Sequence, residues 1–397
     1  MRIAVFAPDC PYPPDRGGRA DVWRRLLALG LGGHELMLVH LFEPSGPLAP
    51  KPQDLAAMDG RLARRFAFPI KRGRWRTVRQ LAASPWLPWH AATRVPDGDE
   101  LARLDEALRD FAPDLLLLEG PWFGEMVRRT AKLLSVPYVY RSHNIEHRYL
   151  RGQARAARHW RDRIAWRLAC IGLERYEQAL MREARHVLDI SQEDRAFWAA
   201  RGVTGSWLPP LPEQAFRDRP VQVQPSDLLF LGNLRTPNNI QGLRWLVAEV
   251  LPLLRARRPD VCLTVVGSRP SPELVAELNA QPGVRLRADQ PDVLPWLFGA
   301  RVLVNPVATG SGVQSKTLDM LMTDAPIVSR AQGLSGLPDS FAALLRIAET
   351  PAAFADAAWA ALQEPVAVDP ARVAARTMFM PAGVNEALQT VVAGRGA

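Results

Sequence analysis

One stretch near the end of the chain, residues 304–336, constrains the fold more than any other. It begins as an apolar strand that ends at Asn305 and Pro306, and a loop of small residues follows at 308–312. A helical pattern then covers about 313–322, and a second apolar strand lies at 327–328. Strand, glycine loop, helix and strand in this order predict a parallel α/β sheet.

The junction of loop and helix has the chemistry of a phosphate site. Free backbone N–H groups and the positive end of a helix dipole would face a ligand there. The loop residues that we single out are Gly310, Ser311, Gly312 and Val313. Lys316 adds a full charge, and Asp319 shares its helix face and can bind sugar hydroxyls. Two plainer interpretations stay open: a common α/β connection, and an exposed Lys316–Asp319 pair of little energetic consequence.

Length and composition predict two full-sized domains with basic surfaces. The chain has 397 residues, 48% of them hydrophobic, and a formal net charge of +9. Phosphorylated ligands and anionic surfaces are therefore plausible partners. Arginine dominates the basic residues, since lysine occurs only at Lys51, Lys71, Lys132 and Lys316. The three scattered cysteines indicate neither a disulfide framework nor a metal site, and the short N-terminal apolar run favours a cytoplasmic location.

The first part of the chain reads as a βαβ unit. An apolar strand at 2–7 is followed by a loop with Gly17 and Gly18, a helix at 19–29 and a strand at 35–41. The loop lacks the GxGxxG pattern, which disfavours a dinucleotide cofactor. Gly17 and Gly18 could equally serve only a tight turn.

We predict a first domain over 1–207, a proline-rich linker over 208–226 and a second domain over 227–375. The final segment, 376–397, is expected to form a helix that could pack back on the first domain.

A polar cluster follows the predicted strand at 137–140. It contains His143, a catalytic candidate, and Arg141, Asn144 and Glu146, which are candidates for binding an acceptor. Ligands of open α/β sheets bind at the carboxyl ends of strands, which favours a functional interpretation. A structural role for the histidine is the alternative.

Two basic segments stand out in the first half of the chain. Residues 61–79 carry arginine and lysine without acidic residues and adjoin several tryptophans, and 149–185 reads as a long helix with a basic first half. Each is either a solvated face or a surface for an anionic membrane or a phosphorylated lipid.

Several segments of the second half recur in order in a known family. LFLGNLRTPNN, WLVAEVLPLLRARRPDVCLTVVGS, PGV and VLVNPVATGSGVQSKTLDML together resemble the C-terminal half of GT-B glycosyltransferases, in particular glycosyltransferase family 4, the glycosyl transferases group 1. The resemblance implies two Rossmann-like domains that face an interdomain cleft. It also implies a retaining enzyme that needs no metal.

The resemblance carries roles to individual residues. Lys316 would bind donor phosphate, Asp319 would contact the ribose, and His143 would lie beside the reacting sugar. The remaining donor contacts would come from glycine loops in both domains, namely Gly17, Gly18, Gly232, Asn233, Arg235 and Gly267. Members of the family often carry Glu at the positions of Ser311 and Asp319, and Arg at the position of Asn233, so the donor contacts here depart from the family pattern.

The leading hypothesis is a glycosyltransferase that moves a sugar from a nucleotide-diphosphate sugar to a glycan or a lipid-phosphate-linked acceptor, in surface polysaccharide or glycolipid synthesis. It would need no cofactor and could work at the inner face of the membrane. The alternative is a non-catalytic protein, derived from such an enzyme, that binds nucleotide sugars or polyanions. A nucleic-acid partner is disfavoured, because the basic runs lack a recognised reading motif.

Overall fold

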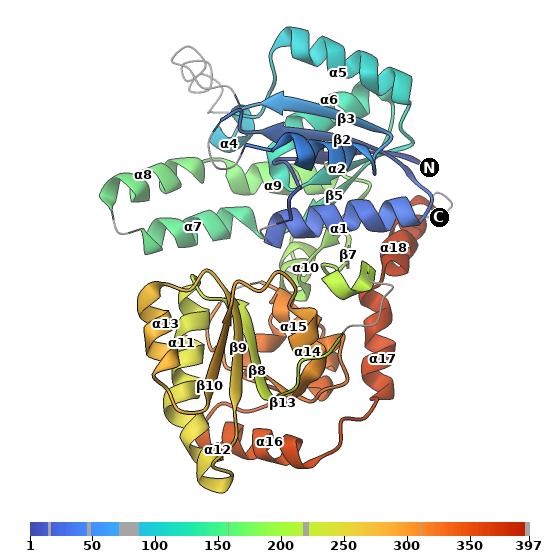
Figure 1. Ribbon diagram of the computed structural model, residues 1–397. Coiled ribbons are helices and arrows are strands. Elements are labelled where there is room, and N and C mark those ends of the chain that lie inside the picture. Colours follow the sequence, from blue (N-terminus) through green and yellow to red (C-terminus); the bar gives the residue numbers. More distant parts are fainter. Residues whose placement is uncertain are drawn as a thin grey trace. The chain divides into compact units, whose positions relative to one another are not determined.

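Two parallel β-sheets organise the chain in the computed structural model (Figure 1). The structure describes residues 1–14, 17–45, 49–70, 87–157, 159–216, 222–310 and 312–393. One compact unit comprises Met1–Leu211 and Pro381–Ala397, and the other comprises Pro212–Met380. Each unit contains one sheet and its own hydrophobic core. The predicted linker, 208–226, contains the boundary between them.

The first unit holds a seven-stranded sheet in the order β3-β2-β1-β4-β5-β6-β7, with every neighbouring pair parallel. Its strands are β1 (Arg2–Ala7), β2 (Glu35–Phe42), β3 (Arg64–Pro69), β4 (Leu115–Glu119), β5 (Tyr138–Ser142), β6 (His186–Asp189) and β7 (Gly205–Trp207). Its helices are α1 (Gly17–Leu31), α2 (Pro52–Asp59), α4 (Trp89–Ala92), α5 (Gly98–Phe111), η1 (Pro121–Phe123), α6 (Gly124–Leu134), α7 (Glu146–Ala156), α8 (Trp160–Ala169), α9 (Leu173–Glu183), α10 (Gln192–Ala199) and α18 (Pro381–Ala393).

The second unit holds a six-stranded sheet in the order β10-β9-β8-β11-β12-β13, again with every neighbouring pair parallel. Its strands are β8 (Ser226–Asn233), β9 (Leu263–Ser268), β10 (Val284–Ala288), β11 (Ala300–Asn305), β12 (Ile327–Ser329) and β13 (Arg346–Ile347). Its helices are η2 (Glu213–Phe216), α11 (Pro237–Trp245), η3 (Leu246–Val250), α12 (Leu251–Arg257), α13 (Pro272–Asn279), α14 (Leu294–Gly299), α15 (Ser315–Leu321), η4 (Ala331–Leu334), η5 (Asp339–Leu344), α16 (Pro351–Gln363), α17 (Pro370–Arg376) and η6 (Thr377–Phe379).

The sequence pattern explains both sheets. The central strands are continuous apolar runs, and β1 and β4 are buried along almost their whole length. This is the pattern of parallel strands that helices cover on both faces, so the predicted α/β class is confirmed. In both sheets the strand order reverses once, between β1 and β4 and between β8 and β11. Ligands of doubly wound sheets bind at such reversals.

The single long helix expected over 149–185 is wrong, because the segment folds as α7, α8 and α9. α7 ends where Ala157 adopts an extended backbone, with φ −62° and ψ 125°. α9 begins after Gly172, whose φ of 71° lies in the left-handed region that only glycine adopts without strain. Two backbone breaks therefore override a helical pattern of side chains.

The last helix, α18, belongs to the first unit although it ends the chain. The side-chain amide of Asn385 donates to the carbonyl oxygen of Ala28 on α1, at 3.0 Å. The guanidinium of Arg185 donates to the carbonyl oxygen of Val391, at 2.9 Å. Val384 and Leu388 are buried in the contact.

Candidate active site

Polar side chains stand at the carboxyl edge of the first sheet, where its strand order reverses. Asp9 follows β1, Glu119 ends β4, and His143 follows β5. Because the strands are parallel, these three residues come to the same edge. The fold therefore brings together two carboxylates and an imidazole from segments that are far apart in the sequence.

A buried cluster of charges lies behind this edge. The guanidinium of Arg25 on α1 bonds to the carboxylate of Asp21, one turn earlier, at 2.9 Å, and to that of Glu119 at 2.7 Å. Arg141 on β5 reaches Asp21 at 3.4 Å. All four side chains are buried. Such charges are stable in the interior only when they are paired and hydrogen-bonded, as they are here.

The cluster stays ionised in spite of its burial. Burial alone would raise the pKa of Asp21, but Arg25 and Arg141 lower it well below its ordinary value. The pKa of Glu119 is also lowered, because Arg25 and His143 outweigh the effect of burial. The cluster therefore provides two fixed negative charges at the edge of the sheet.

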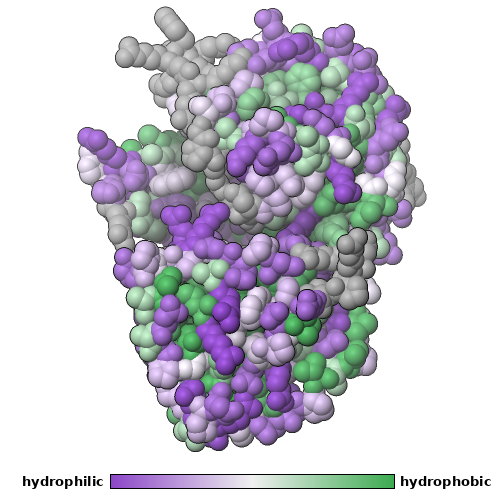
Figure 2. Space-filling model, viewed as in Figure 1, coloured by the Kyte–Doolittle hydropathy of each residue, from purple (hydrophilic) through white to green (hydrophobic). Residues whose placement is uncertain are grey.

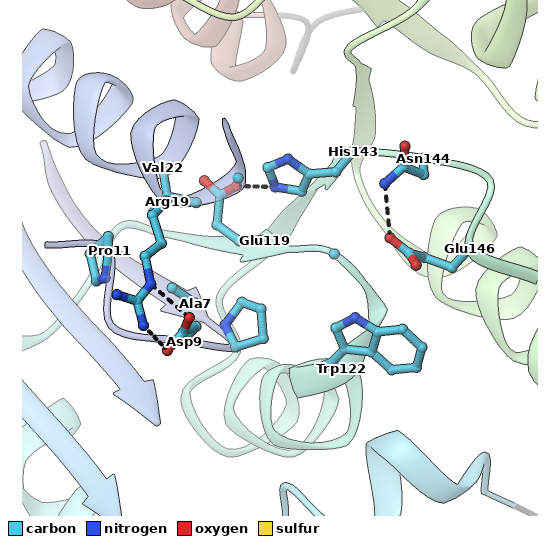
Figure 3. Close-up of a pocket in the computed structure, with 13 residues that line it drawn as sticks. Ala7, Asp9, Pro11, Arg19, Val22, Glu119, Trp122, His143, Asn144 and Glu146 are labelled. Atoms are coloured by element: carbon cyan, nitrogen blue, oxygen red, sulfur yellow. Dashed lines mark hydrogen bonds and ion pairs between the residues drawn. The ribbon is translucent and has the colours of Figure 1, made fainter. Parts of the chain in front are cut away.

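His143 lies between these two charges. Its Nε2 is 2.8 Å from Oε2 of Glu119, and its Nδ1 is 3.3 Å from Oδ2 of Asp21. Each ring nitrogen therefore faces one of the two carboxylates. The contacts fix the orientation of the ring while leaving it partly accessible from a pocket (Figure 3).

The pocket has a volume of about 290 Å³ and lies entirely in the first unit. Figure 3 shows an Asp9–Arg19 ion pair at one end, the His143–Glu119 pair in the middle and Asn144 with Glu146 at the other end. It is lined by Ala7, Pro8, Asp9, Pro11, Gly18, Arg19, Val22, Glu119, Gly120, Trp122, His143, Asn144 and Glu146. A concave site with an aromatic wall and converging polar groups suits a sugar or another polar small molecule.

Two lining residues have distinctive chemistry. Burial, together with the charge of Glu177, raises the pKa of Glu146 to about 7, so this carboxyl can hold or release a proton near neutral pH. Trp122 is half-buried and offers a flat apolar surface. The ring of His90 meets it edge-on at 5.2 Å, and the Arg94 guanidinium lies over it at 5.6 Å.

The structure brings together some of the residues predicted for the first domain but not all of them. Gly18, His143, Asn144 and Glu146 line the one pocket. Arg141 is fully buried and donates to the carbonyl oxygen of Leu208, a placement that argues against direct contact with an acceptor. Its position suits holding Asp21 in place instead.

The glycine pair at the start of α1 is not required by backbone conformation. Neither Gly17 nor Gly18 has a positive φ, and a Cβ at either position would meet no atom within 4 Å. The open space at Gly18, which lines the pocket, leaves room for a ligand close to the backbone.

The second unit carries a separate polar cluster at the carboxyl edge of its sheet. Lys316 on α15 is buried and donates to Oδ1 of Asn239 on α11, at 2.8 Å. Its ammonium also lies 5.2 Å from the centre of the Phe230 ring. Burial lowers the pKa of Lys316 from the ordinary 10.5 to about 7. Over the described ranges, no carboxylate forms an ion pair with this amine.

The glycine loop before α15 is hydrogen-bonded to the start of α11. The side-chain amide of Asn238 donates to the carbonyl oxygen of Thr309, at 3.0 Å. Gly310 and Gly312 have φ values of 154° and 73°, which other residues adopt only with strain. α15 itself is only seven residues long, so we attribute anion binding to Lys316 and the loop rather than to a helix dipole.

The other predicted donor contacts lie at the same edge of this sheet. Gly232 and Asn233 end β8, beside Gly267 at the end of β9. Asn233 accepts from the backbone N–H of Arg235 at 2.9 Å, and the Arg235 side chain is exposed. A Cβ at Gly267 would overlap Leu234 at 2.5 Å, so this glycine is needed for packing whatever else it does.

Three predicted positions remain, namely Ser311, Val313 and Asp319. Asp319 and Val313 are half-buried, and the carbonyl oxygen of Asp319 accepts from Gln214 at 3.2 Å. Ser311 lies outside the described residues.

Sequence reasoning missed the charges that hold His143. Asp21 and Arg25 lie on the face of α1 that also carries Val22, Leu26 and Leu29. An acidic and a basic residue four apart on an apolar helix face were the available signal. Glu119 lies 94 residues after Arg25, and no local sequence pattern predicts their contact.

Comparisons with known proteins agree with this architecture. Residues 225–364 match the family model described as "Glycosyl transferases group 1". A Klebsiella pneumoniae protein described as an "uncharacterized 44.6 kDa protein in cps region" is 25% identical over 363 residues, which are 89% of each chain. The predicted resemblance of the second half of the sequence to glycosyl transferases group 1 is thus confirmed.

Solved structures extend the likeness to the whole chain. Anabaena HepE in complex with UDP and glucose matches with a TM-score of 0.59 and 11% identity, over 99% of this chain and all of that one. S. aureus TarM, in a complex that includes UDP, matches with a TM-score of 0.62 and 10% identity, over 98% and 99% of the two chains. Sucrose-phosphate synthase from Thermosynechococcus elongatus matches with a TM-score of 0.57 and 16% identity, over 100% and 98%. At such identities the likeness shows the fold, which is that of GT-B glycosyltransferases.

The described ranges contain neither a helix that could span a membrane nor a cluster of metal-ligating side chains. None of the helices there is long and apolar enough to cross a membrane. No group of three or more His, Cys, Asp or Glu side chains in those ranges is arranged to hold a metal ion.

Proposed function

We propose that this protein is a retaining glycosyltransferase that moves a sugar from a nucleotide-diphosphate sugar to a glycan or lipid-linked acceptor. The observation that carries the proposal is Lys316, a buried amine at the carboxyl edge of a doubly wound sheet, with an amide and an aromatic ring as neighbours. A buried cation without a carboxylate partner is suited to a ligand that brings its own negative charge. The family match over 225–364 and the UDP complexes of the structural neighbours support a nucleotide diphosphate as that ligand.

The proposed chemistry requires stabilisation of a leaving diphosphate. Breaking the bond between the sugar and the phosphate leaves new negative charge on the diphosphate oxygens. Lys316, the N–H groups of the loop at Gly310 and Gly312, and the exposed Arg235 would stabilise that charge as it develops. Asp319 would bind the ribose. On this proposal no metal ion is needed.

The pocket of the first unit is our candidate for the acceptor site. Trp122 offers a stacking surface for a sugar ring, and Asn144 and Glu146 offer hydrogen bonds to its hydroxyl groups. His143, held by Glu119 and Asp21, would stand beside the reacting sugar.

The cellular role that we propose is the synthesis of a surface polysaccharide or glycolipid. The cps-region relative from Klebsiella pneumoniae supports the polysaccharide part. We place the protein in the cytoplasm, at the inner face of the membrane. Of the basic run at 61–79, on which a membrane contact was predicted, residues 71–79 lie outside the described residues.

Calorimetric titration with UDP tests the donor site. We expect Lys316→Met to weaken UDP binding by about 2 kcal/mol, or about thirtyfold, because a charged hydrogen bond to phosphate is lost. Lys132→Met is the matched control, since it removes the same charge from an exposed position on α6. If the Lys316 variant binds UDP as tightly as the control does, Lys316 does not hold phosphate.

A transfer assay separates an enzyme from a non-catalytic binding protein. The protein would be incubated with UDP-sugars and lipid-phosphate acceptors, and products would be identified by mass spectrometry. Product with the donor's anomeric configuration, formed equally well with a chelator present, would support the retaining, metal-independent proposal. Tight UDP binding without transfer to any acceptor would favour the alternative.

A further inference from the structure

An apolar stripe is exposed along α8. Trp160, Ile164 and Leu168 on this helix, and Ile171 in the turn after it, are 65%, 46%, 56% and 58% exposed. Spacings of four, four and three residues place all of them within about 80° of one helix face. Isolated exposed apolar residues are ordinary on a protein surface, whereas an aligned set with a tryptophan indicates a surface that something else covers.

Arginine flanks this stripe on both sides. Helical spacing puts Arg163 and Arg167 along one border and Arg161 along the other. All three are exposed. Arg161 lies over the Trp160 ring at 5.5 Å, and Arg163 donates to the carbonyl oxygen of Ala157 at 3.1 Å. In the part of the chain that the structure describes, no acidic side chain pairs with Arg161 or Arg167.

The hairpin of α7 and α8 carries a large excess of positive charge. Residues 147–171, which include most of α7 and all of α8, contain seven arginines and one acidic residue, Asp162. Asp162 lines a cavity together with Trp89 and Trp166, on the side of α8 away from the stripe. Figure 1 shows α7 and α8 as a pair of helices that extends away from the strands of its sheet, and Figure 2 shows hydrophilic and hydrophobic side chains next to each other on this pair. The stripe is therefore presented together with a net positive charge.

We propose that α8 docks this protein on an anionic lipid surface. Trp160, Ile164, Leu168 and Ile171 would enter the boundary between head groups and acyl chains, and the flanking arginines would contact lipid phosphates. An interfacial helix has this composition: one apolar face with tryptophan, a basic border and a modest overall hydrophobicity. Long arginine side chains can keep their charge among head groups while their stems cover apolar surface. The proposal goes beyond sugar transfer and does not depend on it.

Charge argues against a second copy of this chain as the occupant. A symmetric dimer through α8 would bring the same face of both copies together. The arginines of one copy would then face those of the other, which opposes association. An anionic lipid surface instead supplies the opposite charge over the whole area of the stripe.

The test is flotation of the full-length protein with vesicles. We expect binding to vesicles with about 30% anionic phosphatidylglycerol, weak binding to pure phosphatidylcholine, and a clear loss between about 0.1 M and about 0.5 M NaCl. Ile164→Glu combined with Leu168→Glu should lower the bound fraction about tenfold, because charged side chains would enter the apolar boundary. Arg161→Gln combined with Arg167→Gln should lower it less and should flatten the salt dependence.

The matched control is Val366→Glu combined with Val368→Glu. These residues are also exposed, at 49% and 65%, and lie between α16 and α17 in the second unit. The control adds the same charge and should leave binding unchanged. Circular dichroism and the UDP titration verify that each variant is folded.

Three results would overturn the proposal. One is no binding of the wild-type protein to anionic vesicles. Another is equal binding by the Ile164, Leu168 variant and the control. The third is a concentration-dependent dimer that the Ile164, Leu168 variant abolishes in light scattering, which would assign the stripe to a second copy.

Discussion

At the scale of single residues, Lys316 shows how burial lowers the pKa of an amine that has no carboxylate partner among the described residues. Its neighbours are the Asn239 amide oxygen and the Phe230 ring, which offset part of the cost of burying a cation. The pKa therefore falls to about 7 from the ordinary 10.5. Because the folded protein binds fewer protons than the unfolded chain between these two values, this group makes stability rise with pH from about 7 to 10.5.

The same shift predicts that UDP binding is coupled to proton uptake. At about pH 8.5 the Lys316 amine is mostly neutral and the UDP phosphates are fully ionised, so a bound diphosphate should draw a proton onto the amine. Calorimetry in two buffers of different ionisation enthalpy should report an uptake that approaches one proton per UDP. Affinity should fall with rising pH above about 7, with a limit of about tenfold per pH unit.

The Lys316→Met variant tests whether Lys316 is the group that takes up the proton. It should bind UDP weakly and with no buffer dependence, while Lys132→Met should behave as the wild type does. Equal proton uptake by wild type and Lys316→Met would place the titrating group elsewhere.

The two candidate sites also differ in how far the sequence could predict them. Lys316 was predictable because its loop, helix and family pattern are contiguous in the chain. The contact of Arg25 with Glu119 was not, because it joins residues 94 apart and depends on strand order. Arg141 has the composition of a binding residue, and only its complete burial indicates a positioning role.

At the scale of elements, a glycine in the left-handed conformation separates α8 from α9, although the side-chain pattern predicts one continuous helix. Gly172 has a φ of 71° and immediately precedes α9. Helical periodicity continues across it, since Ile171 and Arg175 keep the spacing. The pattern of side chains therefore predicts that helix forms here but not where the backbone turns.

Alanine substitutions at two glycines test this explanation. Gly172→Ala should lower the free energy of unfolding by about 1 kcal/mol, because a Cβ disfavours the left-handed conformation. Gly152→Ala, within α7, should raise it by about 0.5 to 1 kcal/mol, because alanine is the better helix former. A Cβ would meet open space at both positions, so packing does not distinguish the two changes.

Urea unfolding of both variants gives the comparison. Changes of the same sign at Gly172 and Gly152 would mean that the backbone conformation at Gly172 does not define the break between α8 and α9.

At the scale of the whole molecule, the position of an element in the sequence does not decide which of the two units it belongs to. The central strands of each sheet, such as β1, β4, β8 and β11, could be predicted in order, because each is a local apolar run, whereas β3 (RRFAFP) and β7 (GSW) at the edges of the first sheet are not. The chain leaves the second unit after Met380 and contributes α18 to the first. Its partner surface on α1 lies more than three hundred residues earlier, as the bond from Asn385 to Ala28 shows. Local pattern alone could not have fixed that contact.

This arrangement predicts that a substitution that destabilises α18 also destabilises α1, near the start of the chain. Leu388→Ala removes a buried side chain of α18 and should destabilise the first unit by about 2 to 4 kcal/mol. Hydrogen exchange followed by mass spectrometry should then show faster exchange in α1 and unchanged exchange in β8 and β11. Leu278→Ala on α13, a buried leucine of the second unit, should give the reverse pattern. If Leu388→Ala instead accelerates exchange in the second sheet and spares α1, α18 stabilises the unit that precedes it in sequence and not the unit assigned to it here.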